Sequence, residues 1–265
     1  MILSPLEVGA LRILSAAVFL LPFVWKNFKE VQKKQFKSLL SVGLVGSFLP
    51  AFLFAIAQTR LESSITGVLN AMTPIFTILV GLVFFAQKQN SRVYLGMIGG
   101  FIGTVLLIAA GSGGSIADFN FYGLFVILAT LMYAFNLNII KYNLKGLRAI
   151  TITSLSLAFV GPLALIVLLG FTGFTTKIVE VDGAGFATMY IVILGVVGTA
   201  LALIVFNNLV RMTDPVFTSS VTYIIPVVAV IWGILDGEVL TLLHFVGIVA
   251  ILIGVYVANS SRKKA

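Results

Sequence analysis

Long apolar runs separated by short polar stretches fill this chain. Nine runs are about 18 residues long or longer, the length that an α-helix needs to cross a hydrocarbon core of about 30 Å. The pattern predicts an all-α polytopic membrane protein with nine transmembrane helices. The predicted helices are Pro5–Trp25, Leu39–Thr59, Ser63–Phe85, Val93–Ala110, Asn120–Ile140, Ile150–Phe171, Ala187–Val210, Pro215–Leu235 and Leu240–Asn259.

The amino-acid composition also indicates a membrane protein. Of the 265 residues, 60% are hydrophobic and only 10% are charged, whereas soluble domains carry about 25% charged residues. So few polar residues cannot cover a soluble core, and the lipid bilayer is the expected surrounding. The chain has no cysteine, which excludes disulfides, thiolate catalysis and cysteine-ligated metals.

The net charge of +8 raises the alternative of nucleic-acid binding, but the basic residues are distributed as in a membrane protein. Only Arg60 and Lys177 fall in one set of alternate loops, and Arg12 lies within the first helix. Basic loops stay on the cytoplasmic side, so we expect an external N-terminus, a cytoplasmic C-terminus, a plasma or inner membrane location and no nucleic-acid partner. The other set of loops and the tail carry Lys26, Lys29, Lys33, Lys34, Lys37, Lys88, Arg92, Lys141, Lys145, Arg148, Arg211, Arg262, Lys263 and Lys264.

Landmark residues recur at a fixed separation, which indicates an internal repeat. Pro74 and Pro226 are 152 positions apart. The same separation relates Gly43 to Gly195, Gly46 to Gly198, Thr66 to Thr218 and Gly81 to Gly233, and a slip of one residue relates Gly96 to Gly247 and Gly103 to Gly254. The predicted organisation is a first repeat over 1–110, a linker over 111–119, a second repeat over 120–259 and a basic tail over 260–265.

The two repeats are expected to be inverted, because the helix that carries Pro74 starts outside and the helix that carries Pro226 starts inside. Inverted repeats are typical of secondary transporters that work by alternating access, with substrate held near the membrane midplane. Each proline lies about 16 Å along its helix, near mid-membrane. We expect paired hinges at these prolines; static packing kinks are the alternative.

The stretch PLEVGALRILSAAVFLLPF, from Pro5 to Phe23, Arg12 within it, the mid-helix prolines and Gly237-Glu238 resemble EamA-type members of the drug/metabolite transporter superfamily. The resemblance covers almost the whole chain. It implies ten helices in two inverted five-helix repeats and export of small metabolites such as amino acids.

Two features depart from this family pattern. Gln87 stands in the first repeat where its mate in the second is Glu238. Only nine helices can be counted, and the partner of Asn120–Ile140 would lie upstream of Met1. We therefore expect an N-terminally shortened form of a ten-helix transporter, or an internal start assigned by mistake. A groove of one helix width is then expected beside the second, third and fifth counted helices.

Polar residues inside the apolar runs are the candidates for a substrate path, because such residues usually face a bundle interior. Arg12 is expected to meet a substrate carboxylate or an outer gate; it could instead snorkel outward or pair with Glu7. For Asn70, Thr73 and Thr77, which form one polar stripe at i, i+3 and i+7, hydrogen bonding between helices is the alternative. Asn207 and Asn208 are expected at the membrane interface. The remaining candidates are Asn70, Thr73, Thr77, Tyr133, Asn136, Thr199, Thr222 and Tyr223.

No catalytic set is visible, so the chain is not expected to be an enzyme and no cofactor is expected. His244 is the only histidine and has no second ligand for a metal. No carboxylate lies at mid-membrane, which slightly favours facilitated export over proton antiport. The alternatives to an exporter are a channel, a non-transporting membrane subunit or an inactive truncated transporter, and a homodimer stays open. The run GMIGGFIG, from Gly96 to Gly103, predicts close helix packing.

Overall fold

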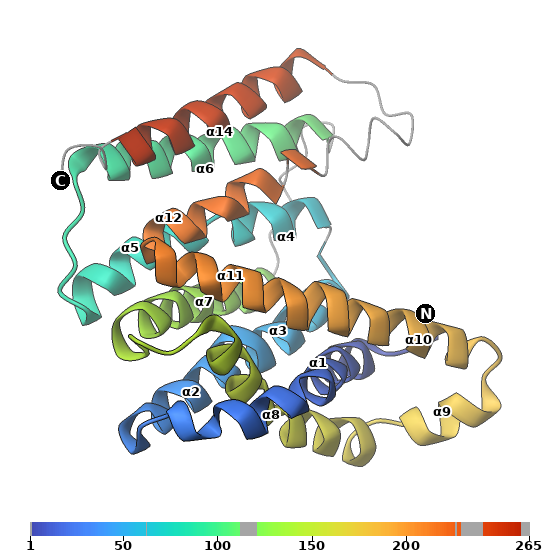
Figure 1. Cartoon of the computed structure of the whole chain (residues 1–265). Helices are drawn as coiled ribbons and strands as arrows, with labels where there is room; N and C mark the ends of the chain where they lie inside the picture. The colour runs from blue at the N-terminus through green and yellow to red at the C-terminus, as the bar shows by residue number, and fades with distance from the viewer. Residues whose placement is uncertain (1, 62, 112–120, 226, 229–240, 261–265) are drawn as a thin grey trace. The chain divides into compact units, whose positions relative to one another are not determined.

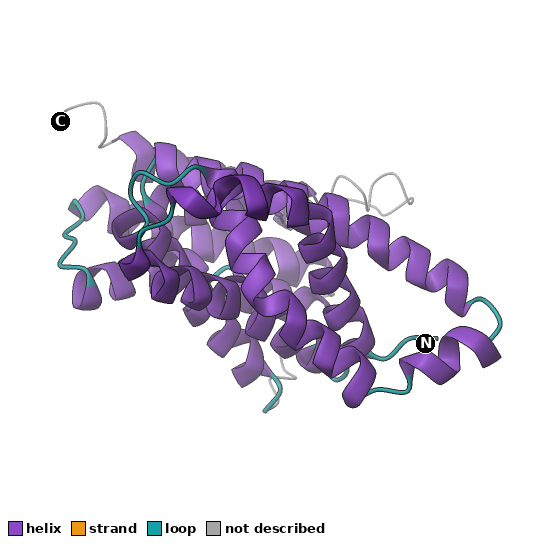
Figure 2. Cartoon of the chain, turned by 60° about the horizontal axis from the view of Figure 1, so that its bottom comes forward, coloured by secondary structure: helices purple, strands orange, loops and turns teal. Residues whose placement is uncertain are grey.

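The fold is helical throughout the part of the chain that the structure describes. The computed structural model describes residues 2–61, 63–111, 121–225, 227–228 and 241–260, and no strand occurs in them (Figure 1, Figure 2). The described elements of the first half are α1 (Pro5–Asn27), η1 (Phe28–Glu30), η2 (Lys33–Gln35), α2 (Phe36–Gly43), η3 (Leu44–Phe48), α3 (Leu49–Ala57), α4 (Ser63–Asn70), α5 (Thr73–Phe84) and α6 (Ser91–Gly111). Those of the second half are α7 (Gly123–Asn143), α8 (Ala149–Gly170), α9 (Phe174–Glu180), α10 (Ala184–Leu194), η4 (Gly195–Leu201), α11 (Ala202–Met212), α12 (Pro215–Ser219), η5 (Ser220–Tyr223) and α14 (Leu242–Ser260).

Within the described residues, five continuous helices are long and apolar enough to cross a membrane. They are Pro5–Glu30, Lys33–Ala57, Gly123–Asn143, Ala149–Gly170 and Ala184–Met212. Three further apolar helices are shorter, over Thr73–Phe84, Ser91–Leu106 and Leu242–Ala258. The count of nine stays a prediction, and the predicted hinge at Pro226 lies outside the described residues.

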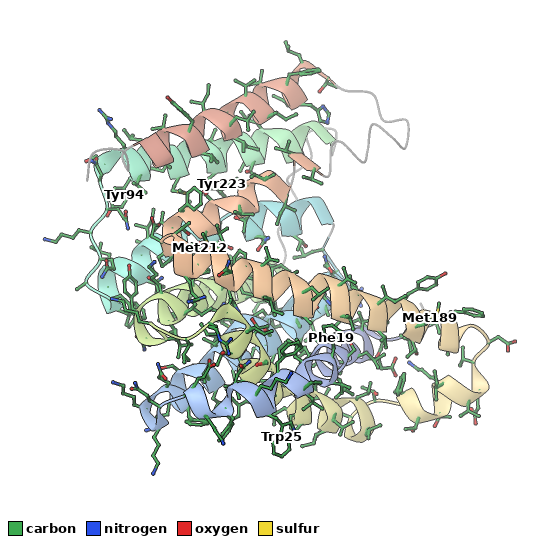
Figure 3. The ribbon with its side chains drawn as sticks, in the orientation of Figure 1. Phe19, Trp25, Tyr94, Met189, Met212 and Tyr223 are labelled. Carbon is green, nitrogen blue, oxygen red and sulfur yellow. The ribbon has the colours of Figure 1, made fainter. Side chains whose placement is uncertain are left out.

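Large apolar side chains cover the outer faces of these helices. Phe19 and Trp25 on α1 are 41% and 85% exposed, and Met189 on α10 is 46% exposed (Figure 3). Lipid is the favourable surrounding for such faces. Trp25 stands near the end of α1, where an amphipathic indole commonly meets the headgroup region of a bilayer.

The chain forms two compact units, and each takes helices from both halves of the sequence. Unit 1 comprises Met1–Thr59 and Ile139–Thr213, and unit 2 comprises Arg60–Asn138 and Asp214–Ala265. Residues far apart in sequence therefore meet inside each unit. Neither unit consists of a single half of the chain.

Unit 1 is built around the pairing of α1 with α8. Small side chains such as Ala17 let the two helices approach, and a Cβ at Gly161 would lie only 2.8 Å from the Cβ of Ala17. The junction is closed at one end by Arg148, which donates to the Asn27 side chain at 2.7 Å and pairs with Glu30. Close packing of small residues is a main source of helix association in a bilayer.

Two helical segments of unit 1 contain π-helical turns where the sequence predicted regular helix. These are η3, between α2 and α3, and η4, between α10 and α11. A side chain at Gly195, the first residue of η4, would collide with the Ser15 hydroxyl and lie 2.7 Å from the Arg12 carbonyl. The glycine thus lets η4 press against α1, and a wider turn re-aims the side chains that follow it.

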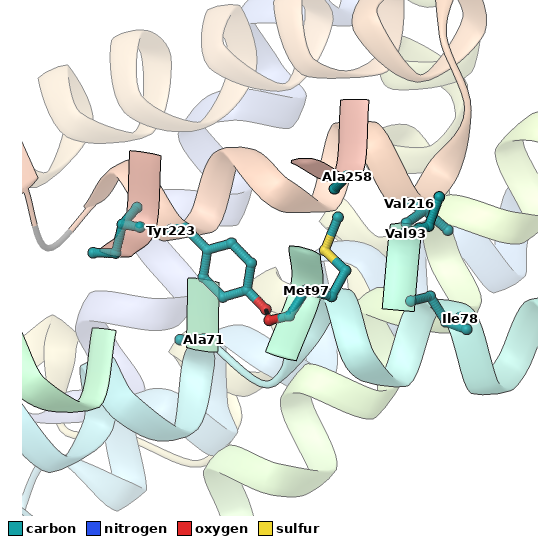
Figure 4. Close-up of a cluster of buried hydrophobic side chains, with 8 residues drawn as sticks. Ala71, Ile78, Val93, Met97, Val216, Tyr223 and Ala258 are labelled. Carbon is teal, nitrogen blue, oxygen red and sulfur yellow. Dashed lines mark hydrogen bonds between the residues drawn. The ribbon is translucent and has the colours of Figure 1, made fainter. Parts of the chain in front are cut away.

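Unit 2 is built around the pairing of α6 with α14, as the glycine run predicted. A Cβ at Gly103 would lie 2.9 Å from the Gly247 carbonyl, and a Cβ at Gly254 would lie 2.7 Å from the Gly96 carbonyl. Beside this pair, the Tyr223 ring fills the core and its hydroxyl donates to the Met97 carbonyl at 2.8 Å (Figure 4). Backbone contact this close confirms that the glycines serve packing.

The short helix α9 was missed by the sequence pattern, which left 172–186 as a loop. It lies between α8 and α10, and its apolar side chains are half-buried or exposed, with Val179 82% exposed. Seven residues are too few for an apolar periodicity to stand out from a loop.

Candidate functional site

The predicted helix Ser63–Phe85 is interrupted, so the expectation of a proline inside a continuous helix was wrong. α4 ends at Asn70 and α5 begins at Thr73, which puts Pro74 in the first turn of α5. A proline is tolerated there because the first N–H groups of a helix have no partner within the helix. The interruption lies at Ala71 and Met72, and the Met72 N–H donates only three residues back, to Leu69 at 3.1 Å.

The interruption leaves the Asn70 carbonyl without its usual donor, because Pro74 has no N–H. The Thr73 hydroxyl replaces that donor, at 2.7 Å from the Asn70 carbonyl oxygen. One turn later, the Thr77 hydroxyl donates to the Thr73 carbonyl at 2.8 Å. Thr73 and Thr77 are buried, with 2% and 0% of their surface exposed. Their hydroxyls are used in holding the start of α5.

Asn138 of α7 completes this arrangement. Its amide nitrogen donates to the Thr77 carbonyl at 3.3 Å and to the Ala134 carbonyl at 2.9 Å. Its side-chain oxygen would lie 3.2 Å from a Cβ at Gly81, so the glycine makes room for it. The sequence reasoning missed Asn138, although an asparagine within an apolar run is a visible signal that a polar contact is needed.

Among the described residues of unit 2, three buried side-chain oxygen atoms have no hydrogen-bond partner. They are Oγ1 of Thr66 and Oδ1 of Asn70, one turn apart on α4, and Oδ1 of Asn136 on α7. Leaving a buried polar atom unpaired costs about 1–3 kcal/mol. Asn70 and Asn136 were candidates from the sequence, whereas Thr66 was noted only as part of the repeat. Tyr133, one turn before Asn136, is half-buried.

In unit 1, Arg12 of α1 reaches η4. Its Nη2 donates to the Thr199 hydroxyl at 3.4 Å, while its buried Nε has no partner in the part of the chain that the structure describes. The alternative that Arg12 pairs with Glu7 does not occur in the structure. Glu7 is 1% exposed, and its Oε2 accepts from the Ser4 N–H at 2.6 Å and from Lys177 at 3.0 Å. Ser4 and Glu7 form a capping box that starts α1.

The hydroxyls of the last two candidates are used inside unit 2. Thr222 is half-buried, and its hydroxyl donates to the Ser219 carbonyl at 2.8 Å. Tyr223 is fully buried against α6. The candidates therefore divide by unit: Arg12 and Thr199 lie in unit 1, and the rest lie in unit 2. Whether any of them contacts substrate stays a prediction.

Asn207 has a contact that the sequence did not indicate. It is 2% exposed, and its amide donates to the Thr153 hydroxyl of α8 at 2.9 Å. The sequence predicts an interfacial position for both Asn207 and Asn208, but only Asn208 is exposed, near Arg211. Adjacent residues on a helix point about 100° apart, so one asparagine can face the bundle while its neighbour faces outward.

The described residues were predicted to hold no metal site, with His244 as the only histidine. No group of three or more histidine, aspartate or glutamate side chains gathers there. His244 accepts from the Thr241 N–H through Nδ1 at 3.1 Å and so serves the start of α14.

Apolar helices, one of them interrupted next to buried polar atoms, are features that many membrane transport proteins share. The chain belongs to the EamA-like transporter family, whose pattern matches residues 2–109 and 120–260. It is a multi-pass membrane transporter.

Two relatives and one solved structure are similar over nearly the whole chain. The inner membrane transporter YedA of Escherichia coli strain K12 is 24% identical, over 97% of this chain and 82% of its own length. A transporter of Archaeoglobus fulgidus is 24% identical, over 98% and 90%. One crystal structure matches with a TM-score of 0.75 at 16% identity, over 99% of this chain and 90% of its own, which supports the fold.

Proposed function

We propose that this inner-membrane transporter exports small metabolites, amino-acid-like or related, by alternating access, with its C-terminus in the cytoplasm. The observation that carries the proposal is the interruption of the helix at Asn70–Pro74. There this chain combines a restarted helix with buried oxygens of Thr66 and Asn70 that have no partner among the described residues. Irregular backbone at membrane depth is tolerated where protein or a polar cavity meets it.

Contacts within unit 2 support inverted repeats. A two-fold relation requires contacts in matched pairs, so that the equivalents of two touching residues also touch. The sequence pairs Gly96 with Gly247 and Gly103 with Gly254. The approaches of Gly103 to Gly247 and of Gly254 to Gly96 are therefore one contact and its symmetry mate. Inverted repeats let a transporter exchange two equivalent conformations across the membrane.

Contacts within unit 1 support the same relation. The sequence pairs Gly43 with Gly195. A Cβ at Gly43 would collide with the Ser156 carbonyl of α8, and a Cβ at Gly195 would lie 2.7 Å from the Arg12 carbonyl of α1. Each glycine adjoins a π-helical segment, η3 or η4. Both the contact and the wider turn therefore recur in the two halves.

Counterflow tests the proposal. The purified protein is reconstituted into liposomes loaded with an unlabelled amino acid, and uptake of the labelled form is followed across a panel of amino acids. Alternating access predicts accelerated exchange, since a loaded carrier returns with substrate. Leak without exchange would indicate a channel, and failure to exchange any amino acid or related metabolite would contradict the proposal.

The Asn70 acceptor provides the residue-level test. We expect Asn70→Leu to slow exchange about tenfold, the effect of losing a hydrogen bond worth about 1.4 kcal/mol. Asn208→Leu is the matched control, because Asn208 is exposed on α11. Equal rates for the two variants would count against a substrate path at the interruption.

A further inference from the structure

The guanidinium of Arg12 is far less satisfied than that of Arg148 in the same unit. Arg148 donates to both oxygens of the Glu30 carboxylate and to the Asn27 side chain. Arg12 makes one bond of 3.4 Å to a neutral hydroxyl, and its Nε is buried without a partner. A guanidinium presents five N–H donors in a planar fork. Most of the donor capacity of Arg12 is thus unused by the described protein.

The neighbouring acid is not available to Arg12. Glu7, the one carboxylate on α1 itself, is buried and is engaged by Lys177 and by the N-cap of the helix. Within the described residues Arg12 forms no ion pair, since the only salt bridges there are Arg148–Glu30 and Lys177–Glu7. A charge at membrane depth is costly and usually has a partner. An anion would supply the partner that the described residues do not give Arg12.

Local packing holds the guanidinium in place. Gly195 brings η4 against the α1 backbone at Arg12 and Ser15. Thr199, one π-helical turn further along η4, then lies within hydrogen-bond reach and is itself 8% exposed. A guanidinium fixed by a neighbour loses less freedom when it binds a ligand. The close approach thus orients Arg12 in advance.

We propose that Arg12 binds the carboxylate of the transported molecule, with Thr199 as the positioning residue. The inference rests on the proposed export function and names its substrate class. A carboxylate accepts two parallel N–H bonds from a guanidinium, a pairing that neutral groups cannot make. Transport should therefore require a free acid, and the carboxamide of the same molecule should be a poor substrate.

The test compares amino acids with their α-carboxamides as competitors of counterflow and as ligands that raise the melting temperature of the purified protein. For wild type we expect the free acids to compete at least tenfold better, the effect of one charge-assisted bond. Arg12→Gln should abolish that preference, Arg12→Lys should keep part of it, and Thr199→Val should reduce it. Arg92→Gln, at an exposed position in unit 2, should keep it in full.

The outcomes separate the two proposals. Wild type could show no exchange at all, while free acids still raise its melting temperature more than carboxamides do. In that case the export proposal fails and the Arg12 site stands. If wild type treats acids and carboxamides alike, or Arg12→Gln keeps the preference, the Arg12 site is overturned. The wild-type comparison needs no variant, so it remains decisive even where Arg12→Gln does not fold. The headgroup of an anionic lipid is the other source of an oxyanion for Arg12, so the wild-type comparison is repeated without anionic lipid. A preference for free acids that vanishes under this condition overturns substrate binding at Arg12.

Discussion

The bond between Thr73 and Asn70 gives a prediction that isolates one hydrogen bond. Thr73→Val keeps the shape of the side chain and removes the hydroxyl that donates to the Asn70 carbonyl at 2.7 Å. No backbone donor can replace it, because Pro74 has no N–H. The site is 2% exposed, so water does not take over either.

The expected cost follows from this burial. An orphaned buried acceptor costs about 1–3 kcal/mol, whereas side-chain hydrogen bonds measured between membrane helices average about 0.6 and reach about 1.7 kcal/mol. We therefore expect Thr73→Val to lower the free energy of unfolding by about 1–1.5 kcal/mol. In a Pro74→Ala background the new N–H of residue 74 can donate to Asn70, so the same change should cost below about 0.5 kcal/mol.

The assay is a double-mutant cycle on SDS-induced unfolding in mixed micelles, followed by circular dichroism. Thr175→Val on α9, at an exposed position, is the control for the substitution itself. A coupling energy of about 1 kcal/mol supports the reasoning. Equal costs of Thr73→Val with and without Pro74 would refute it, because the hydroxyl would then not be standing in for the missing backbone donor.

Two further predictions use the same unfolding measurement. Gly254→Ala should cost about 1–3 kcal/mol, because its Cβ would lie 2.7 Å from a carbonyl oxygen of α6, whereas Gly173→Ala, which meets nothing within 4 Å, should be neutral; equal effects would show that α6 and α14 do not approach this closely. Lys177→Met should destabilise the protein more than Glu7→Gln. Lys177→Met leaves the Glu7 carboxylate, which is 1% exposed, without its cationic partner, whereas Glu7→Gln removes the buried charge itself. The reverse order would show that Glu7 has another cationic partner.

The sequence predicted local structure best at residues whose covalent structure has one main effect on the backbone, such as proline and glycine. Pro74 cannot donate a backbone hydrogen bond, so a disturbance near it was predictable, as was close packing at the glycines of α6. The form of the disturbance was not predictable. Whether a helix kinks or restarts depends on which side chains replace the missing donor, here Thr73 from the next turn.

The hydrogen-bond partners of buried polar side chains were harder to predict than the positions of those side chains in the sequence. Arg12, Asn70 and Asn136 stand out in apolar runs, but nothing local distinguishes a satisfied side chain from an unsatisfied one. Asn138 and Asn207 looked alike in sequence, and their partners lie 61 and 54 positions away. Such pairings come from the packing of whole helices, which a single sequence does not encode as a readable pattern.

The pairing of α6 with α14 has a consequence for how this chain is made. α6 ends at Gly111 and α14 begins at Leu242, so the glycine face of α6 has no α14 to pack against until residues 242–260 have left the ribosome. During that interval the glycine face of α6 lacks the backbone contacts with α14 that it makes in the folded protein. The same holds for unit 1, because α1 packs against α8, which is synthesised later. Neither unit can therefore form its main helix pair until a helix of the second half has been synthesised, and a chain that stalls before that point would leave α1 or α6 without its packing partner.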